Sequence, residues 1–154
     1  MLSQLISPSD IKVNLESSEN EECFAELLEI MHSKQPQIVR AEALNALCTR
    51  EEKSSTAVFP YVAVPHAVCK SVKNISVALG ISRKGIEFAS PIDSDKKNPL
   101  VNVVFQILFD AESDLRISLL KDILQLVSTT DFVSRVLTMN NPVDIFELLQ
   151  EYDM

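Results

Sequence analysis

Glycine is scarce in this sequence of 154 residues, which contains only Gly80 and Gly85. The Gly-rich loops that hold nucleotide phosphates need several glycines close together, so that the backbone can approach the phosphate oxygens. Neither the P-loop fingerprint nor the dinucleotide-binding fingerprint occurs. Gly-rich phosphate loops are therefore excluded.

Cysteines and long apolar runs are also few. Cys23, Cys48 and Cys69 are widely spaced and form no CxxC pair, which argues against a disulfide framework or a zinc site and suits a reducing compartment. No apolar run approaches the roughly 20 residues that span a bilayer. The start of the sequence, Met1–Gln4, lacks the basic residues and the apolar stretch of a secretion signal. We therefore expect a cytoplasmic protein that does not insert into a membrane.

Basic residues are outnumbered, with 14 Lys and Arg against 22 Asp and Glu. The net charge of −8 makes nucleic acid an improbable partner. The charge is uneven, because residues 50–88 contain six basic and three acidic side chains and carry +3, while the remainder carries −11. Such a positive region suits an anionic group such as a phosphate, and it is equally compatible with ordinary surface scatter.

Apolar residues make up 46% of the chain, enough to fill one core, and residues 1–154 are predicted to form a single domain. β-prone runs alternate with amphipathic ones, which predicts an α/β fold whose strand order the pattern does not specify. We expect strands at 11–15, 61–64, 75–81 and 101–109. The last of these is almost wholly apolar and suits a central strand covered on both faces.

The expected helices have mostly clear ends. The first follows an N-cap at Ser17-Ser18 and stops at Gln35-Pro36. The others are expected at about 38–50, 114–127, 131–139 and 142–151, with a charged loop at 93–99. The inward positions expected for the second and third helices are Ala41, Leu44, Leu47, Cys48, Ile117, Leu120, Ile123, Leu124 and Val127.

The two histidines differ in their surroundings. His32 lies near the end of a helix, where a cation suits the helix dipole, and we interpret it as structural. His66 follows a β-prone run and Pro65 at a strand-to-loop transition, a place typical of reactive side chains and also of ordinary packing or surface residues. No nucleophile-elbow motif occurs to indicate a hydrolytic site. The two separated histidines show no HxxEH-like spacing, so we expect no metal.

Residues 49–66 carry the most specific pattern in the chain. They read Thr-Arg-Glu-Glu-Lys-Ser-Ser-Thr-Ala-Val-Phe-Pro-Tyr-Val-Ala-Val-Pro-His. This segment resembles, without a gap, the T-R-E-x-x-x-S-T-x-x-x-x-x-[IV]-A-[IV]-P-H motif of fructose/mannitol-type enzyme IIA domains of the phosphoenolpyruvate-dependent sugar phosphotransferase system, a family that includes the nitrogen-regulatory IIA proteins. Residues 85–88 resemble the G-I-x-F turn of that family, and the strand at 101–109 and the closing helices follow in family order.

The resemblance implies a mixed β-sheet flanked by helices on both faces, and a phosphoryl carrier that needs no cofactor. It implies that His66 accepts the phosphoryl group, that Arg50 stabilises it, and that Ser55 and Thr56 help to line the site. The implied donor is a histidine-containing phosphocarrier protein, and the implied receiver is an enzyme IIB domain or a regulatory protein target. The alternative is a non-catalytic regulatory interaction module that kept the IIA fold and lost efficient phosphotransfer.

Two departures from the family pattern bear on that choice. Loop glycines of the family are replaced here by Ser54, Ala57, Phe59 and Tyr61, so we expect a stiffer and bulkier loop. A second active-site histidine of many members is absent, and a gap-free alignment puts Arg116 at its position. Arg116 either reaches the phosphoryl oxygens or points into solvent, and the sequence leaves both possibilities open.

Overall fold

The computed structural model describes residues 2–89 and 98–153. Its helices and strands follow in this order along the chain: η1 (Leu2–Gln4), η2 (Pro8–Asp10), β1 (Ile11–Lys12), α1 (Asn20–Lys34), α2 (Arg40–Lys53), β2 (Val62–Ala63), β3 (His66–Val68), β4 (Ser76–Glu87), β5 (Leu100–Phe109), α3 (Arg116–Thr129), α4 (Phe132–Val136) and α5 (Pro142–Tyr152).

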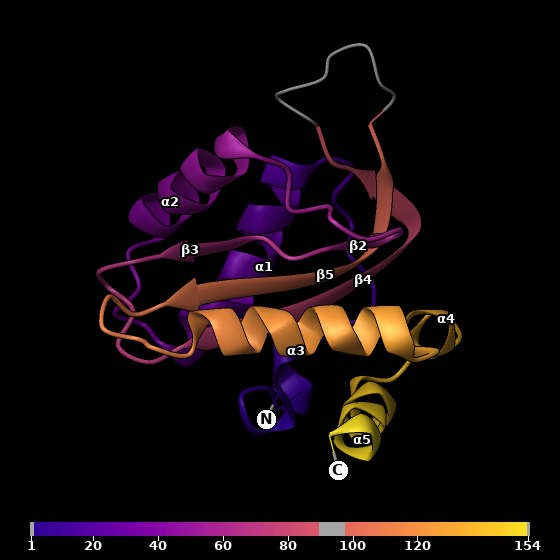
Figure 1. The fold of residues 1–154 in the computed structure, drawn as a ribbon. Helices are drawn as coiled ribbons and strands as arrows, with labels where there is room; N and C mark the ends of the chain where they lie inside the picture. The colour runs from indigo at the N-terminus through magenta and orange to yellow at the C-terminus, as the bar shows by residue number, and fades with distance from the viewer. Residues whose placement is uncertain (1, 90–97, 154) are drawn as a thin grey trace.

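One mixed sheet forms the centre of the fold (Figure 1). Its order is β1-β4-β5-β2, and β3 also pairs with β5. The long strands β4 and β5 are antiparallel, whereas β1 runs parallel to β4, and β2 and β3 run parallel to β5. Because β2 and β3 pair with successive parts of β5, they form one interrupted edge of the sheet.

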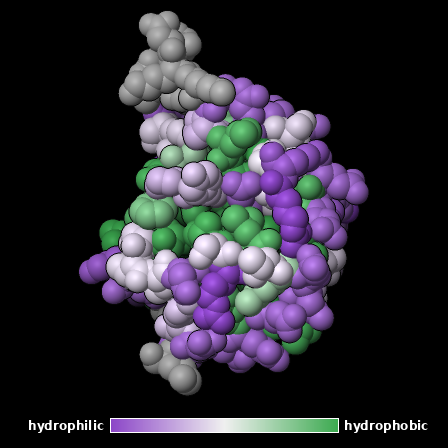
Figure 2. Space-filling model, turned by 90° about the vertical axis from the view of Figure 1, so that its right-hand side faces the viewer, coloured by the Kyte–Doolittle hydropathy of each residue, from purple (hydrophilic) through white to green (hydrophobic). Residues whose placement is uncertain are grey.

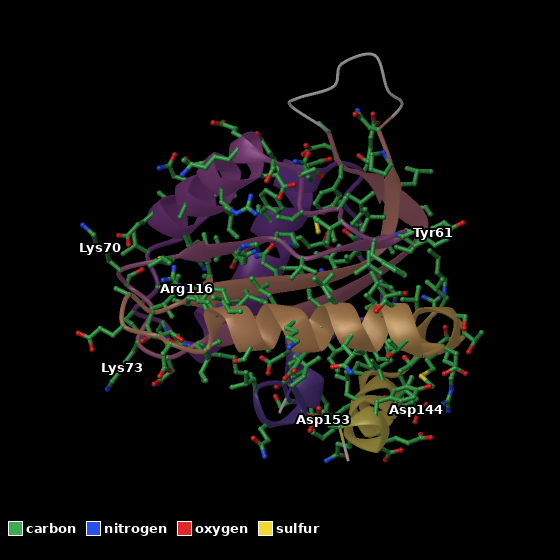
Figure 3. The ribbon with its side chains drawn as sticks, in the orientation of Figure 1. Tyr61, Lys70, Lys73, Arg116, Asp144 and Asp153 are labelled. Carbon is green, nitrogen blue, oxygen red and sulfur yellow. The ribbon has the colours of Figure 1, made fainter. Side chains whose placement is uncertain are left out.

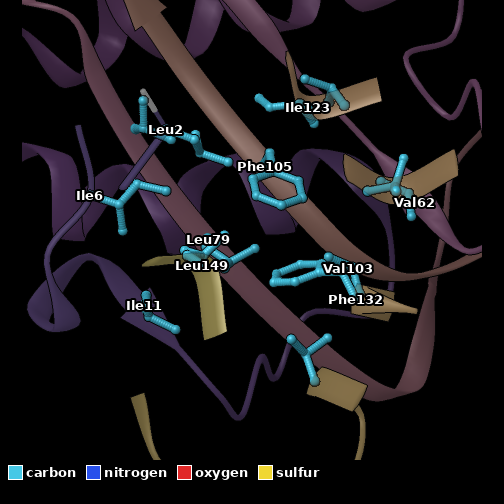
Figure 4. Packing of buried hydrophobic residues seen from close by; sticks show 14 of the residues in the cluster. Leu2, Ile6, Ile11, Val62, Leu79, Val103, Phe105, Ile123, Phe132 and Leu149 are labelled. Atoms are coloured by element: carbon cyan, nitrogen blue, oxygen red, sulfur yellow. The ribbon is translucent and has the colours of Figure 1, made fainter. Parts of the chain in front are cut away.

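Helices cover both faces of this sheet. Helices α1 and α2 lie against one face, and α3, α4 and α5 lie against the other, where Phe105 of β5 packs with Phe132 and Ile123 (Figures 1 and 4). The central strand β5 is buried on both sides, as its apolar sequence predicts. The predicted fold class, an α/β domain with a mixed sheet between helices, is confirmed.

The start of α1 differs from the prediction. Glu19 is the N-cap, because its carboxylate accepts hydrogen bonds from the backbone N–H groups of Glu21 and Glu22. The hydroxyls of the predicted caps are occupied elsewhere, since Ser17 donates to Glu26 and Ser18 donates to Glu22. A serine that donates to a neighbouring carboxylate is turned away from the helix amides that it was expected to cap.

Other corrections concern strand length and the buried faces of helices. Paired strand at the predicted 11–15 is limited to Ile11–Lys12, although the Leu15 N–H still donates to Ile81 O on β4. In α2 the buried small residue is Ala43, and Ala41 is exposed. The buried side chains of α3 are Leu119, Ile123 and Val127, whereas Ile117 is 82% exposed and Leu124 is 40% exposed. Most of the predicted loop at 93–99 lies outside the described residues.

Candidate active site

His66 is the first residue of β3 and therefore lies within the edge of the sheet. The sequence had instead suggested a strand-to-loop transition at this residue. Its side chain is half-buried, and its ring meets that of Phe109 edge-on with centroids 6.4 Å apart. Ring atom Nδ1 lies 2.8 Å from the carbonyl oxygen of Val64. A carbonyl oxygen can only accept, so Nδ1 carries the proton and donates it. Among the described residues, Nε2 has no hydrogen-bond partner.

Pro65 explains why the sheet edge is interrupted just before His66. Proline has no N–H to give to the ladder, which ends β2 at Ala63. The Val64 N–H instead donates to Thr56 O at 3.0 Å, and Pro65 O accepts from the Ile107 N–H of β5 at 2.9 Å. The backbone on both sides of this break is therefore held, and the Val64 carbonyl is available to the His66 ring.

An open cavity of about 810 Å³ lies between α2, β3 and the start of α3, and His66 lines it. Arg50 and Lys53 line it from α2, Arg116 from the start of α3 and Asp114 from the loop before α3. Figure 3 shows Arg116 between α3 and the β3 edge. Three cationic side chains against one carboxylate give this cavity a net charge of +2 in a protein whose overall charge is −8. Such a cavity suits an anionic group.

The fold brings Arg50 and His66 together although sixteen positions separate them. The Arg50 guanidinium is held by a hydrogen bond from Nη1 to Ser54 O of 3.0 Å. Burial lowers the pKa of His66 below its ordinary value, and the charges of Arg50 and Arg116 lower this pKa further. The His66 ring is therefore neutral at pH 7 and has an unprotonated Nε2.

The two hydroxyl residues predicted for the site have different places. Thr56 lines a second, smaller cavity of about 140 Å³ that also includes His66, but its hydroxyl donates to the buried Glu51 at 2.7 Å. Ser55 lines neither of these two cavities, and its oxygen accepts from the Ala57 N–H at 3.2 Å. His32 lies apart from the site, with Nδ1 3.0 Å from Ile38 O.

Sequence reasoning missed two contributors to the site. Lys53 lies one turn after Arg50 on the same face of α2. Because the helix was predicted to stop at residue 50, Lys53 was counted in the positive region 50–88 but was not assigned to the site. Apolar side chains also surround the cavities, with Val58 60% exposed and Ile117 82% exposed. Figure 2 views the end of the molecule that carries α4, away from Arg116, and shows apolar residues at the centre of that face. Exposed apolar residues beside a reactive group are typical of a surface that meets another protein.

Comparison with known proteins identifies the family. Residues 4–152 match the family described as phosphoenolpyruvate-dependent sugar phosphotransferase system, EIIA 2. The chain belongs to this family of phosphotransferase-system components. The resemblance found in residues 49–66 is therefore confirmed at the level of the family.

Individual relatives agree with this assignment. The fructose-specific EIIABC component of Bacillus subtilis (strain 168) is 32% identical over 89 residues, which are 58% of this chain and only 14% of that protein. The structure of nitrogen regulatory protein IIA-Ntr from Neisseria meningitidis has a TM-score of 0.82 at 19% identity, covering 96% of this chain and 98% of that one. Enzyme IIA mannitol of Escherichia coli, in complex with phosphorylated enzyme IIB mannitol, has a TM-score of 0.72 at 17% identity, covering 95% and 97%. At such identities the structures establish a shared fold.

Residues 2–89 and 98–153 contain no group of three or more His, Cys, Asp or Glu side chains placed to hold a metal ion. In the same residues, no helix is both long enough and apolar enough to cross a membrane.

Proposed function

We propose that this protein is a phosphoryl carrier that accepts a phosphoryl group on Nε2 of His66. The observation that carries the proposal is the hydrogen bond from Nδ1 to Val64 O, which leaves the lone pair on Nε2 in a side chain that lines a positively charged cavity. A neutral imidazole nitrogen is a competent nucleophile toward phosphorus. The lowered pKa of His66 keeps the ring in that form at neutral pH.

The transfer step is a displacement at phosphorus. The lone pair of Nε2 forms the new N–P bond while the N–P bond to the donor histidine breaks, and that electron pair returns to the donor ring. The His66 ring keeps its proton on Nδ1 and becomes cationic, and the Val64 carbonyl stabilises this charge by accepting the Nδ1 hydrogen bond. The protein contributes position and charge, which is how phosphoryl transfer is usually catalysed.

The charge of the phosphoryl group is met by Arg50, whose planar fork can donate two parallel hydrogen bonds to phosphoryl oxygens. Arg116 and Lys53 add positive charge in the same cavity. Helix α3 begins at Arg116, and Leu115 at its N-cap gives no side-chain cap, so its first amides add to the positive potential. Asp114 is the opposing charge.

The donor that fits this site is a histidine-containing phosphocarrier protein, and the receiver is an enzyme IIB domain or a regulatory target. The E. coli relative seen with phosphorylated IIB supports the first kind of receiver. The apolar side chains of Val58, Ile117 and Leu124 beside the cavities suit contact with a protein surface. The setting that this chemistry implies is the cytoplasm, in sugar transport or nitrogen regulation.

The alternative function is a regulatory interaction module that has lost efficient phosphotransfer. One observation favours it: the chain has no histidine after His66, and the cavity holds Arg116 at the start of α3. A permanently cationic arginine cannot change protonation during transfer as a histidine can.

Mixing the purified protein with phosphorylated carrier separates the two functions. The carrier function predicts acid-labile, alkali-stable phosphate on the wild type and on His32→Ala, and none on His66→Ala. A wild-type protein that binds the carrier without gaining phosphate would establish the alternative. Label that persists in a folded His66→Ala variant would remove His66 as the acceptor.

A further inference from the structure

Glu51 follows Arg50 on α2, but its side chain is buried in the protein whereas that of Arg50 lines the cavity. It is only 4% exposed, and Thr56, its partner, is 2% exposed. The Glu51 carboxylate accepts two hydrogen bonds of 2.7 Å, one from the Thr56 N–H and one from the Thr56 hydroxyl. Burying a carboxylate is costly unless its oxygens are satisfied. Because both oxygens of this buried carboxylate accept hydrogen bonds from Thr56, they hold Thr56 firmly in place.

Two further hydrogen bonds connect Thr56 to the reactive ring. The Thr56 carbonyl accepts from the Val64 N–H at 3.0 Å, and the Val64 carbonyl accepts from His66 Nδ1 at 2.8 Å. Each bond holds in place the residue that makes the next one. The orientation of the Val64 carbonyl therefore depends on Thr56, and the position of Thr56 depends on Glu51.

The same segment also holds the cation of the site. Arg50 donates to Ser54 O, two residues before Thr56. The adjacent residues Arg50 and Glu51 thus both hold the segment 54–56, Arg50 through Ser54 and Glu51 through Thr56. Release of the Glu51 bonds would disturb the partner of Arg50 as well as that of His66.

We infer that Glu51 is a positioning residue that, through Thr56 and Val64, sets the orientation of the His66 ring and keeps its proton on Nδ1. The consequence for phosphoryl transfer rests on the function proposed above. The consequence for the ring does not, because the tautomer of His66 is a property of the unphosphorylated protein.

Four variants test this inference with two readouts, the ¹⁵N chemical shifts of the His66 ring and the rate of phosphorylation by phosphorylated carrier. Glu51→Ala removes both acceptors. Glu51→Gln keeps an oxygen that can accept from the Thr56 N–H. Thr56→Val removes only the hydroxyl. Ser82→Ala is the matched control, because Ser82 is fully buried and accepts from the Gly85 N–H at 3.1 Å outside this chain of bonds.

In Glu51→Ala we expect the Nδ1–H tautomer to lose its predominance and phosphorylation to slow by about tenfold or more, since small misplacements of a reacting group cost this much. Glu51→Gln stays close to wild type, and Ser82→Ala keeps the wild-type tautomer at reduced stability. If Glu51→Ala does not fold, Thr56→Val tests the inference in its place. We expect this variant to change the tautomer and the rate in the same direction but by less.

A folded Glu51→Ala or Thr56→Val with the wild-type tautomer and rate would overturn the inference. So would a Ser82→Ala control that loses the tautomer to the same extent, because the effect would then be general destabilisation. If the wild type itself takes no phosphate, the proposed function fails while the ring shifts still decide the role of Glu51.

Discussion

His66 combines a neutral ring with cationic neighbours, and the pH dependence of its reaction follows from this. Burial and the charges of Arg50 and Arg116 lower its pKa. A protonated ring cannot attack phosphorus, so we expect phosphorylation to lose rate only below pH 6.5, the ordinary midpoint of histidine. An NMR titration of the ring should give a pKa below 6.5 and a higher value in Arg50→Ala. A wild-type pKa above 6.5 would contradict this account of the electrostatics.

Arg50 is expected to act on the phosphoryl group as it moves. Replacing it with alanine should slow transfer by one to several orders of magnitude, which corresponds to roughly 2–4 kcal/mol for one charged donor. Arg50→Lys keeps the charge without the planar fork and should be intermediate. Rapid-quench kinetics on folded variants measures the effect. A wild-type rate in Arg50→Ala would reduce Arg50 to a structural cation that holds Ser54.

Arg116 is the residue at which this chain leaves the family pattern, and it lines the same cavity as His66. We expect its fixed charge to favour the phosphorylated state, and stabilisation of that state without an equal gain in the transition state would slow onward transfer. We predict a shorter-lived phosphate and faster transfer in Arg116→His. Arg116→Ala separates loss of charge from gain of a histidine. Identical lifetimes in all three proteins would show that Arg116 takes no part.

At the scale of elements, the turn before β2 contains a residue in a strained backbone conformation. The Val62 N–H donates to Phe59 O at 3.0 Å, closing a tight turn with Pro60 and Tyr61 at its centre. Tyr61 has φ of 69°, and it is the single non-glycine residue with positive φ in the described part of the chain. This turn geometry favours glycine at that position. At four positions this chain has another residue in place of a family glycine, and of these only Tyr61 has a backbone conformation that favours glycine.

The strain at Tyr61 predicts a stabilising substitution. Its side chain is 61% exposed, so little packing is lost on its removal. Tyr61→Gly should be more stable than Tyr61→Ala by about 1 kcal/mol, the penalty that a Cβ brings in the left-handed region. Chemical denaturation of both variants measures the difference. Equal stabilities would indicate that the turn relaxes around the side chain.

The same elements show what the sequence could predict and what it could not. Helix and strand periods located α1 and β5 well, because each buries a long regular stripe. They failed at Ile117, an apolar residue in phase with the helix, because the first turn of α3 borders the cavity and has no layer to pack against. They also missed β3, because Pro65 separates it from β2 and it has only three residues.

For the site, the motif in residues 49–66 predicted Arg50 and His66 as functional residues. The fold places both of them at one cavity. No pattern predicts the bonds of Glu51 to Thr56 or of Val64 to His66. These depend on how the loop is folded back against α2, which is a tertiary feature.

At the scale of the whole molecule, the positive region at 50–88 divides into parts with different roles. Arg50 and Lys53 line the cavity. Arg83 and Lys84 instead hold the N-terminal segment, through hydrogen bonds to Val13 O and Glu16 O. Figure 3 shows Lys70 and Lys73 at the end of the molecule where Arg116 lies, and Asp144 and Asp153 beside α5. Two of the six basic residues of this region therefore line the cavity, and two others hold the N-terminal segment.

The most direct test of the central claim is to locate the phosphoryl group itself. After incubation with phosphorylated carrier, the ³¹P–¹⁵N couplings of the protein should place one phosphoryl group per chain on Nε2 of His66, with the proton still on Nδ1. Phosphate on Nδ1, on another residue, or on no residue of a carrier-bound protein would contradict the account.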